Sequence, residues 1–141
     1  MRDTPKLVPE FEVSDLDKTK QIYIDIFGFD VGYERPEEKF AYMQRGSIHI
    51  MLEEATGPGR RFHNVSLEYP FGRGLNFQIE IDDVEAVYQR VQESDLKINL
   101  PLEEKWYRKD KNEVGNQQFV VFDPDGYLLR FFTDLGERAV K

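Results

Sequence analysis

A small set of polar residues in predicted strands supplies most of the chemistry open to this chain. Its charged or titratable members are Glu10, His49, Glu80 and Arg130. Carboxylates and an imidazole can bind a hard cation or transfer a proton, whereas a guanidinium is a permanent cation that binds anions. Arg130 interrupts the otherwise apolar stretch 127–132, so its position in the fold decides whether a metal can be held beside it.

Residue types that are absent or rare exclude several other mechanisms. The chain has no cysteine, which excludes disulfides, thiolate zinc sites and cysteine nucleophiles. It has no glycine-rich phosphate loop, and two histidines leave little choice of general base. His63 is expected at the surface of a connecting segment. His49 with Glu10 or Glu80 is the one metal arrangement left open, although His49 can equally be an ordinary polar strand residue.

Length and charge set the class of protein. The chain has 141 residues, which suits one domain able to fold without disulfides or a metal. Its formal net charge of −8 repels nucleic acid and attracts cations, or serves solubility alone. No signal-peptide core and no apolar run of about 20 residues is present. We therefore expect a soluble, cytoplasmic protein that binds neither nucleic acid nor membrane.

The elements that must position these residues occur twice. The segments 11–23 and 79–91 both begin with strand-like alternation, pass through an acidic helix start and continue as an amphipathic helix. Three further strand-like segments follow each helix: 29–34, 40–44 and 48–53 in the first copy, and 96–100, 118–122 and 127–132 in the second. A turn, Asp-Pro-Asp-Gly at 123–126, joins the last two.

This repeat predicts an α+β fold made of two βαβββ modules in tandem. The modules span 1–56 and 75–135 of a single domain, 1–141, and the Gly-, Pro- and Arg-rich segment 57–74 links them. Helices on one face of each sheet leave the other face free. We expect the two sheets to form a curved mixed sheet with a concave ligand cleft.

Strand alternation assigns side chains to the cleft. Leu129 and Phe131 are expected in the core, so Arg130 faces the cleft beside Glu10, Gln78 and Glu80. The same argument adds His49, Met51 and Asn76. Alternatively, this face is simply solvated, or Arg130 pairs with a carboxylate for structural reasons.

Trp106 is the only tryptophan, and it stands in the polar segment 104–110 near the end of a predicted strand. It is expected at a pocket edge or a subunit contact, where Tyr107 can join it, or as an anchor that packs its own loop. The charged segment 105–113 is expected to be a mobile loop.

Four segments carry a family resemblance. They are VPEFEVSDLDKTKQIYIDIFGF at 8–29, YPFGRGLNFQIEIDDVEAVY at 69–88, Trp-Tyr-Arg at 106–108, and GNQQFVVFDPDGYLLRF at 115–131. The chain resembles the vicinal oxygen chelate superfamily of glyoxalases, bleomycin resistance proteins and extradiol dioxygenases, and is most similar to the bleomycin-resistance branch. The resemblance implies the tandem βαβββ fold, a homodimer, and ligand pockets near the dimer interface.

The metal ligands of the family do not carry over to this chain. Its His, His and Glu positions, with a further Glu, correspond here to Val8, Asn76, Arg130 and Met51. Valine cannot ligate and arginine repels a cation. The resemblance therefore predicts no metal and no other cofactor, and Arg130 can replace the positive charge of the metal.

The resulting functional prediction is a metal-free protein that sequesters a small, partly aromatic and cationic ligand, with no bond made or broken. The predicted ligand-binding residues are Glu10, His49, Met51, Asn76, Gln78, Glu80, Trp106, Tyr107 and Arg130. Two alternatives stay open. One is a metal-dependent lyase, isomerase or dioxygenase with a displaced metal site, and the other is a small-molecule sensor unrelated to drugs.

Overall fold

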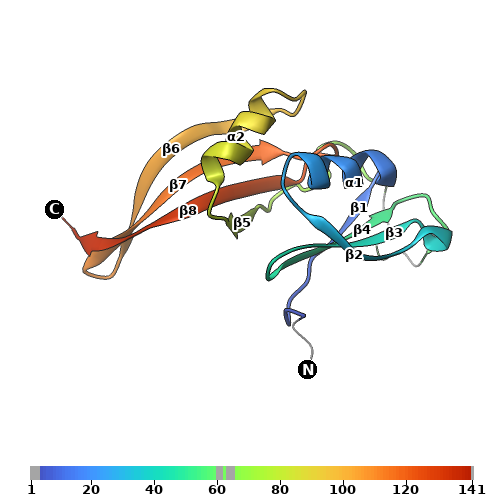
Figure 1. The fold of residues 1–141 in the computed structure, drawn as a ribbon, viewed down its shortest axis with the longest axis horizontal. Helices are drawn as coiled ribbons and strands as arrows, with labels where there is room; N and C mark the ends of the chain where they lie inside the picture. The colour runs from blue at the N-terminus through green and yellow to red at the C-terminus, as the bar shows by residue number, and fades with distance from the viewer. Residues whose placement is uncertain (1–3, 60–61, 63–65, 141) are drawn as a thin grey trace. The chain divides into compact units, whose positions relative to one another are not determined.

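The computed structural model describes residues 4–59, 62 and 66–140. The chain forms two compact units, Met1–Glu68 and Tyr69–Lys141, and the described residues of each contain one α-helix and a four-stranded mixed sheet (Figure 1). His63 and the neighbouring parts of the predicted linker, 60–61 and 63–65, lie outside the described residues.

The first unit contains β1 (Glu10–Val13), α1 (Leu16–Asp25), β2 (Asp30–Arg35), the short 3-10 helix η1 (Pro36–Glu38), β3 (Phe40–Arg45) and β4 (Ile48–Glu54). Its sheet has the order β1-β4-β3-β2, with β1 parallel to β4 and the other pairs antiparallel. The Asp15 side chain caps α1 by accepting a hydrogen bond from the Lys18 amide. The predicted acidic helix start is therefore confirmed here.

The second unit repeats this order with β5 (Phe77–Glu80), α2 (Val84–Gln92), β6 (Ile98–Lys109), β7 (Asn112–Phe122) and β8 (Leu128–Ala139). Its sheet has the order β5-β8-β7-β6, and β5 is parallel to β8. The tandem βαβββ prediction is confirmed. The cleft expected between the two sheets stays a prediction.

Each helix covers one face of its own sheet. In the first unit the α1 residue Tyr23 packs edge-on against Phe27 and Phe29, all three of them buried. In the second unit Phe119 of β7 lies between Tyr88 of α2 and Phe131 of β8. Because side chains alternate along a strand, the residues between these core positions point to the opposite face of each sheet.

The turn at 123–126 ties the start of the second unit to its last strand. The buried Asp123 carboxylate accepts hydrogen bonds from the amides of Asp125 and Tyr127, at 3.0 and 2.9 Å. The Phe71 amide donates to the Asp125 carbonyl, and the Phe71 ring packs edge-on against Tyr127. The predicted turn is confirmed, and the segment before β5 is held by it.

The prediction of a mobile loop at 105–113 is wrong. β6 continues to Lys109 and β7 begins at Asn112, so only Asp110 and Lys111 form the turn, with Asp110 in the left-handed region (φ +56°). The charged side chains of this hairpin flank Trp106 and Tyr107, which make the ordered contacts described below. Charge therefore marks exposed strand positions here, and it does not mark a loop.

Across the described residues, no helix has the length and apolar character that a bilayer-spanning segment requires.

Candidate functional site

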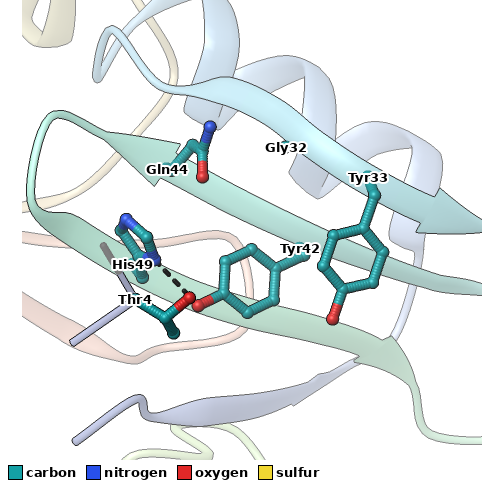
Figure 2. Close-up of a pocket in the computed structure, with 6 residues that line it drawn as sticks. All are labelled: Thr4, Gly32, Tyr33, Tyr42, Gln44 and His49. Carbon is teal, nitrogen blue, oxygen red and sulfur yellow. Dashed lines mark hydrogen bonds between the residues drawn. The ribbon is translucent and has the colours of Figure 1, made fainter. Parts of the chain in front are cut away.

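A hollow of about 330 Å³ opens on the face of the first sheet that points away from α1. Its walls come from the strand residues Tyr33, Tyr42, Gln44 and His49, together with Thr4 and Gly32 (Figure 2). Tyr42 and Gln44 alternate along β3 with Ala41 and Met43, which are fully buried in the core. This alternation places the polar and aromatic residues together on the free face.

Strand pairing builds an aromatic wall for this hollow. Tyr33 and Tyr42 are direct partners between β2 and β3, and their rings stack with centroids 4.9 Å apart at an interplanar angle of 15°. The Tyr42 hydroxyl lies 2.8 Å from Nδ1 of His49, and the two rings meet edge-on. This bond uses Nδ1 and holds the imidazole in one orientation, so Nε2 is the nitrogen left for a ligand.

Glycine at position 32 keeps the hollow open. A Cβ at this position would lie 2.9 Å from Oε1 and 3.0 Å from Cδ of Gln44, closer than side chains normally approach. Gly32 also stands at the irregularity in the β2–β3 pairing, between Val31 and Tyr33. Any larger residue would displace Gln44 and change the wall of the hollow.

Arg130 occupies the free face of the second sheet. Its neighbours in sequence, Leu129 and Phe131, are fully buried, and the pairing places it opposite Gln78 of β5 and Val120 of β7. Nη2 of Arg130 donates a hydrogen bond to Oε1 of Gln78. Nε of Arg130 is buried and has no hydrogen-bond partner among the described residues.

A second polar group lies on the same face, centred on Gln118. This side chain is 1% exposed, and its amide nitrogen donates to Oε2 of Glu103 at 2.9 Å and to the hydroxyl of Tyr107 at 2.7 Å. Gln118 is two residues before Val120 on β7, so it shares the face of Arg130. A buried amide that is bonded in this way fixes the position of Tyr107.

The structure places the predicted site residues on the free faces of the two sheets, in two groups. Trp106 belongs to neither group. Glu10, His49 and Met51 lie on the free face of the first sheet, where Glu10 pairs with Met51. Gln78, Glu80, Tyr107 and Arg130 lie on the free face of the second sheet, and Asn76 directly precedes β5. The two groups belong to different units, and their union in one cleft stays a prediction.

Trp106 lies on the opposite face of the second sheet. Trp106 pairs with Gly115 of β7, so both lie on the same face as Gln117, two residues after Gly115. Gln117 donates a hydrogen bond to Glu85 of α2, which identifies this as the helix-covered face. A Cβ at Gly115 would lie 2.7 Å from three atoms of the Trp106 ring. The placement supports the alternative in which Trp106 anchors its own segment.

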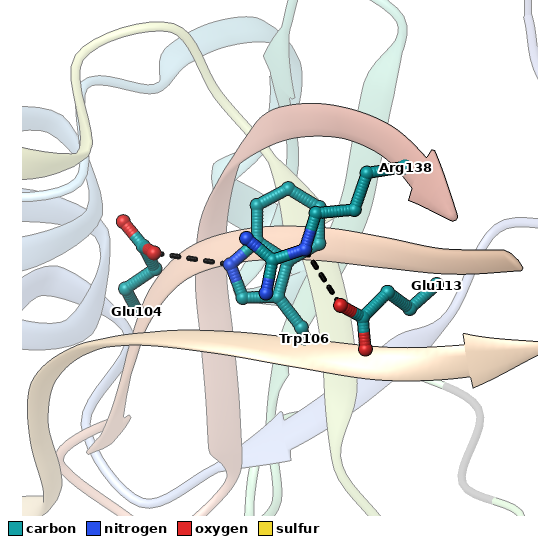
Figure 3. A network of polar contacts seen from close by, with 4 residues as sticks. All are labelled: Glu104, Trp106, Glu113 and Arg138. Carbon is teal, nitrogen blue, oxygen red and sulfur yellow. Dashed lines mark hydrogen bonds and ion pairs between the residues drawn. The ribbon is translucent and has the colours of Figure 1, made fainter. Parts of the chain in front are cut away.

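A cation and two carboxylates complete this anchor (Figure 3). The Arg138 guanidinium lies 3.7 Å from the centroid of the Trp106 ring, and its Nε donates to Glu113 at 2.6 Å. The indole nitrogen donates to Glu104 at 3.0 Å. The contacts join β6, β7 and β8 near the turn that connects β6 to β7.

Replacing Arg138 by alanine is expected to lower the free energy of unfolding by about 1 kcal/mol, because it removes a cation–π contact and a partly exposed ion pair. The emission of Trp106 should shift to longer wavelength as water reaches the ring. Chemical denaturation followed by tryptophan fluorescence measures both effects, since Trp106 is the only tryptophan. Arg108→Ala, at an exposed position of the same hairpin, is the control, and equal effects of the two substitutions would contradict the assignment.

Sequence reasoning missed five of the six residues that line this hollow: Thr4, Gly32, Tyr33, Tyr42 and Gln44. A signal for two of them was available: alternation along the predicted strand 40–44 places Tyr42 and Gln44 on one face, and a short turn brings that strand beside His49. Gln118 was missed because a polar residue between apolar ones gives no indication of its partners.

Comparison with known proteins places this geometry in a family. The profile of the Glyoxalase/Bleomycin resistance protein/Dioxygenase superfamily matches residues 10–131. The chain is also 39% identical to a member of that superfamily from Vibrio splendidus 12B01, over 89% of this chain and 95% of that chain, with a TM-score of 0.40. The protein belongs to the glyoxalase/bleomycin resistance/dioxygenase superfamily.

Two more distant structures share the fold. TioX from Micromonospora sp. ML1 is 23% identical over 93% of this chain and 99% of that chain, with a TM-score of 0.66. A protein of unknown function from Agrobacterium tumefaciens str. C58 is 21% identical over 96% and 98% of the two chains, with a TM-score of 0.69. Comparison with curated proteins finds no match.

The residues that the family resemblance places at metal positions do not fit a metal. Val8 has no donor atom, the Met51 thioether is a soft ligand, and Asn76 offers only an amide. Arg130 holds a permanent positive charge at this position, and its hydrogen bond to Gln78 keeps the guanidinium on the free face of the sheet. Within the described ranges, no three His, Asp or Glu side chains are grouped as a metal site would require.

Proposed function

We propose that this protein binds and sequesters a small, partly aromatic, cationic molecule without the metal of its family and without making or breaking a bond. The observation that carries the proposal is the hollow beside the stacked pair Tyr33 and Tyr42. Stacked phenol rings offer π faces to flat rings and to cations. The acidic chain, with a net charge of −8, adds long-range attraction for a cation.

The remaining parts of the proposal come from the family resemblance. They are a homodimer and a ligand site near its interface, whereas a cytoplasmic location is proposed from the cysteine-free sequence. Trp106 is not assigned to this ligand site, because it lies on the helix-covered face of its sheet.

The test is a calorimetric titration of metal-stripped protein with metal-free bleomycin and, separately, with benzyltrimethylammonium as a minimal aromatic cation. We expect saturable binding of at least one of them and a loss of about tenfold in affinity for Tyr42→Ala, because the variant removes the stacking ring. Tyr42→Phe is the matched control: it keeps the ring, removes only the bond to His49 and should bind nearly as well as the wild type.

Two results would reject the proposal: no saturable binding of either probe, or equal affinity of the wild type and Tyr42→Ala. Metal-dependent turnover that is lost in His49→Ala would instead favour the enzyme with a displaced metal site. Binding of an unrelated metabolite, with no affinity for bleomycin, would favour the sensor.

A further inference from the structure

Arg130 differs from Arg35 and Arg138 in that it makes no ion pair with a described residue although it is half-buried. Arg35 forms an ion pair with Glu38, and Arg138 forms one with Glu113. Arg130 makes one hydrogen bond, to the neutral Gln78, and no ion pair with any described residue. The chain has 27 acidic and 19 basic residues, so a lack of available carboxylates does not explain this.

The setting of Arg130 makes an uncompensated charge costly. The side chain is half-buried, and its neighbours along and across the strands are Leu128, Phe132 and Val120, of which the last two are buried. Nε is shielded from water and unpaired within the described chain. A charged donor in this position loses hydration that no described protein group replaces.

The hydrogen bond to Gln78 fixes the orientation of the Arg130 guanidinium. Arginine has only donors, so the amide of Gln78 must present its oxygen to Nη2, and its own NH₂ group then points elsewhere as a further donor. The hydroxyl of Tyr107, which accepts from Gln118, also keeps its proton for donation. The free face of the second sheet therefore holds donors as well as the Arg130 cation, together with the carboxylates of Glu80 and of Glu103, which accepts from Gln118.

We propose that Arg130 is the centre of an anion-binding site whose natural occupant is a carboxylate group. The two oxygens of a carboxylate match the planar fork of a guanidinium, which can donate from Nε as well as from its terminal nitrogens. The apolar neighbours strengthen such a bond by excluding water. This inference rests on the proposed function of binding small molecules and adds to it a site in the second unit that takes an anionic group.

The experiment titrates the wild type, Arg130→Gln and Arg130→Lys with benzoate by calorimetry at constant ionic strength. Benzamide serves as the neutral isostere and inorganic phosphate as the competing oxyanion. We expect saturable benzoate binding that weakens about tenfold or more in Arg130→Gln, with Arg130→Lys intermediate because it keeps the charge and loses the fork. Arg108→Gln, which removes the same charge from the opposite face of the unit, should bind benzoate as the wild type does.

The inference is overturned if benzoate binds the wild type and Arg130→Gln equally, if benzamide binds as tightly as benzoate, or if neither benzoate nor phosphate binds. Saturable binding of phosphate alone would overturn the carboxylate assignment. These probes leave Tyr42 unchanged, so their failure is distinct from failure of the aromatic-cation proposal.

Discussion

Replacing Phe119 by alanine is expected to lower the free energy of unfolding by about 4 kcal/mol. Phe119 is fully buried in the second unit, with its ring centroid 5.0 Å from Tyr88 and 5.6 Å from Phe131. Removing the ring takes contacts from both the helix and the last strand and leaves a cavity that a sheet cannot easily close. A loss of this size is a large fraction of the stability of an ordinary domain.

Urea denaturation followed by circular dichroism measures this loss. Phe62→Ala is the matched control, because the same atoms are removed from a side chain that is 74% exposed. We expect a change of less than about 0.5 kcal/mol there. A loss of less than about 2 kcal/mol in Phe119→Ala would mean that the unit can repack around the missing ring, and would contradict the core described for it.

Periodicity was sufficient to predict the architecture. Phe11 and Val13, like Ile79 and Ile81, alternate with polar residues and lead into acidic helix starts, so both strand–helix units can be recognised without a structure. Arg130 stands between the apolar residues Leu129 and Phe131, so the same alternation assigned its side chain to the free face. These features depend on a few adjacent residues, and local sequence carries them.

Register and long-range packing could not be predicted in the same way. The hollow of the first unit depends on the pairing of Tyr33 with Tyr42, and a shift of one residue would turn a ring to the other face. The ends of β6 and β7 depend on Trp106 lying against Gly115 and Arg138. In sequence these residues are surrounded by charges, which is why the hairpin was taken for a loop.

Arg130 shows what could and what could not be predicted from the sequence. Its face follows from alternation, but the absence of a carboxylate beside it follows only from the pairing of β8 with β5 and β7, which places Gln78 and Val120 opposite it. The sequence alone left open whether the guanidinium pairs with a carboxylate for structural reasons. Among the described residues it does not, and this observation is the basis of the anion site proposed at Arg130.

Replacing Gly126 by alanine is expected to destabilise the protein by about 3 kcal/mol, for two separable reasons. Gly126 has φ +89°, a conformation that costs an alanine about 1–2 kcal/mol. A Cβ there would also lie 2.5 Å from Cα and Cβ of Pro70, in the segment that the turn holds through the bond from Phe71 to Asp125. That backbone can move only by breaking its contacts with the turn, which adds about 1–3 kcal/mol.

Gly74→Ala separates the two causes, because Gly74 has φ +83° and a Cβ there would meet nothing within 4 Å. It should therefore lose only about 1 kcal/mol, the cost of the backbone conformation. Thermal and urea denaturation of both variants measure the difference, which we expect to be about 2 kcal/mol. Equal losses would mean that Gly126 is required by its backbone conformation alone, and that the close approach of Pro70 to the turn does not contribute to the stability of the second unit.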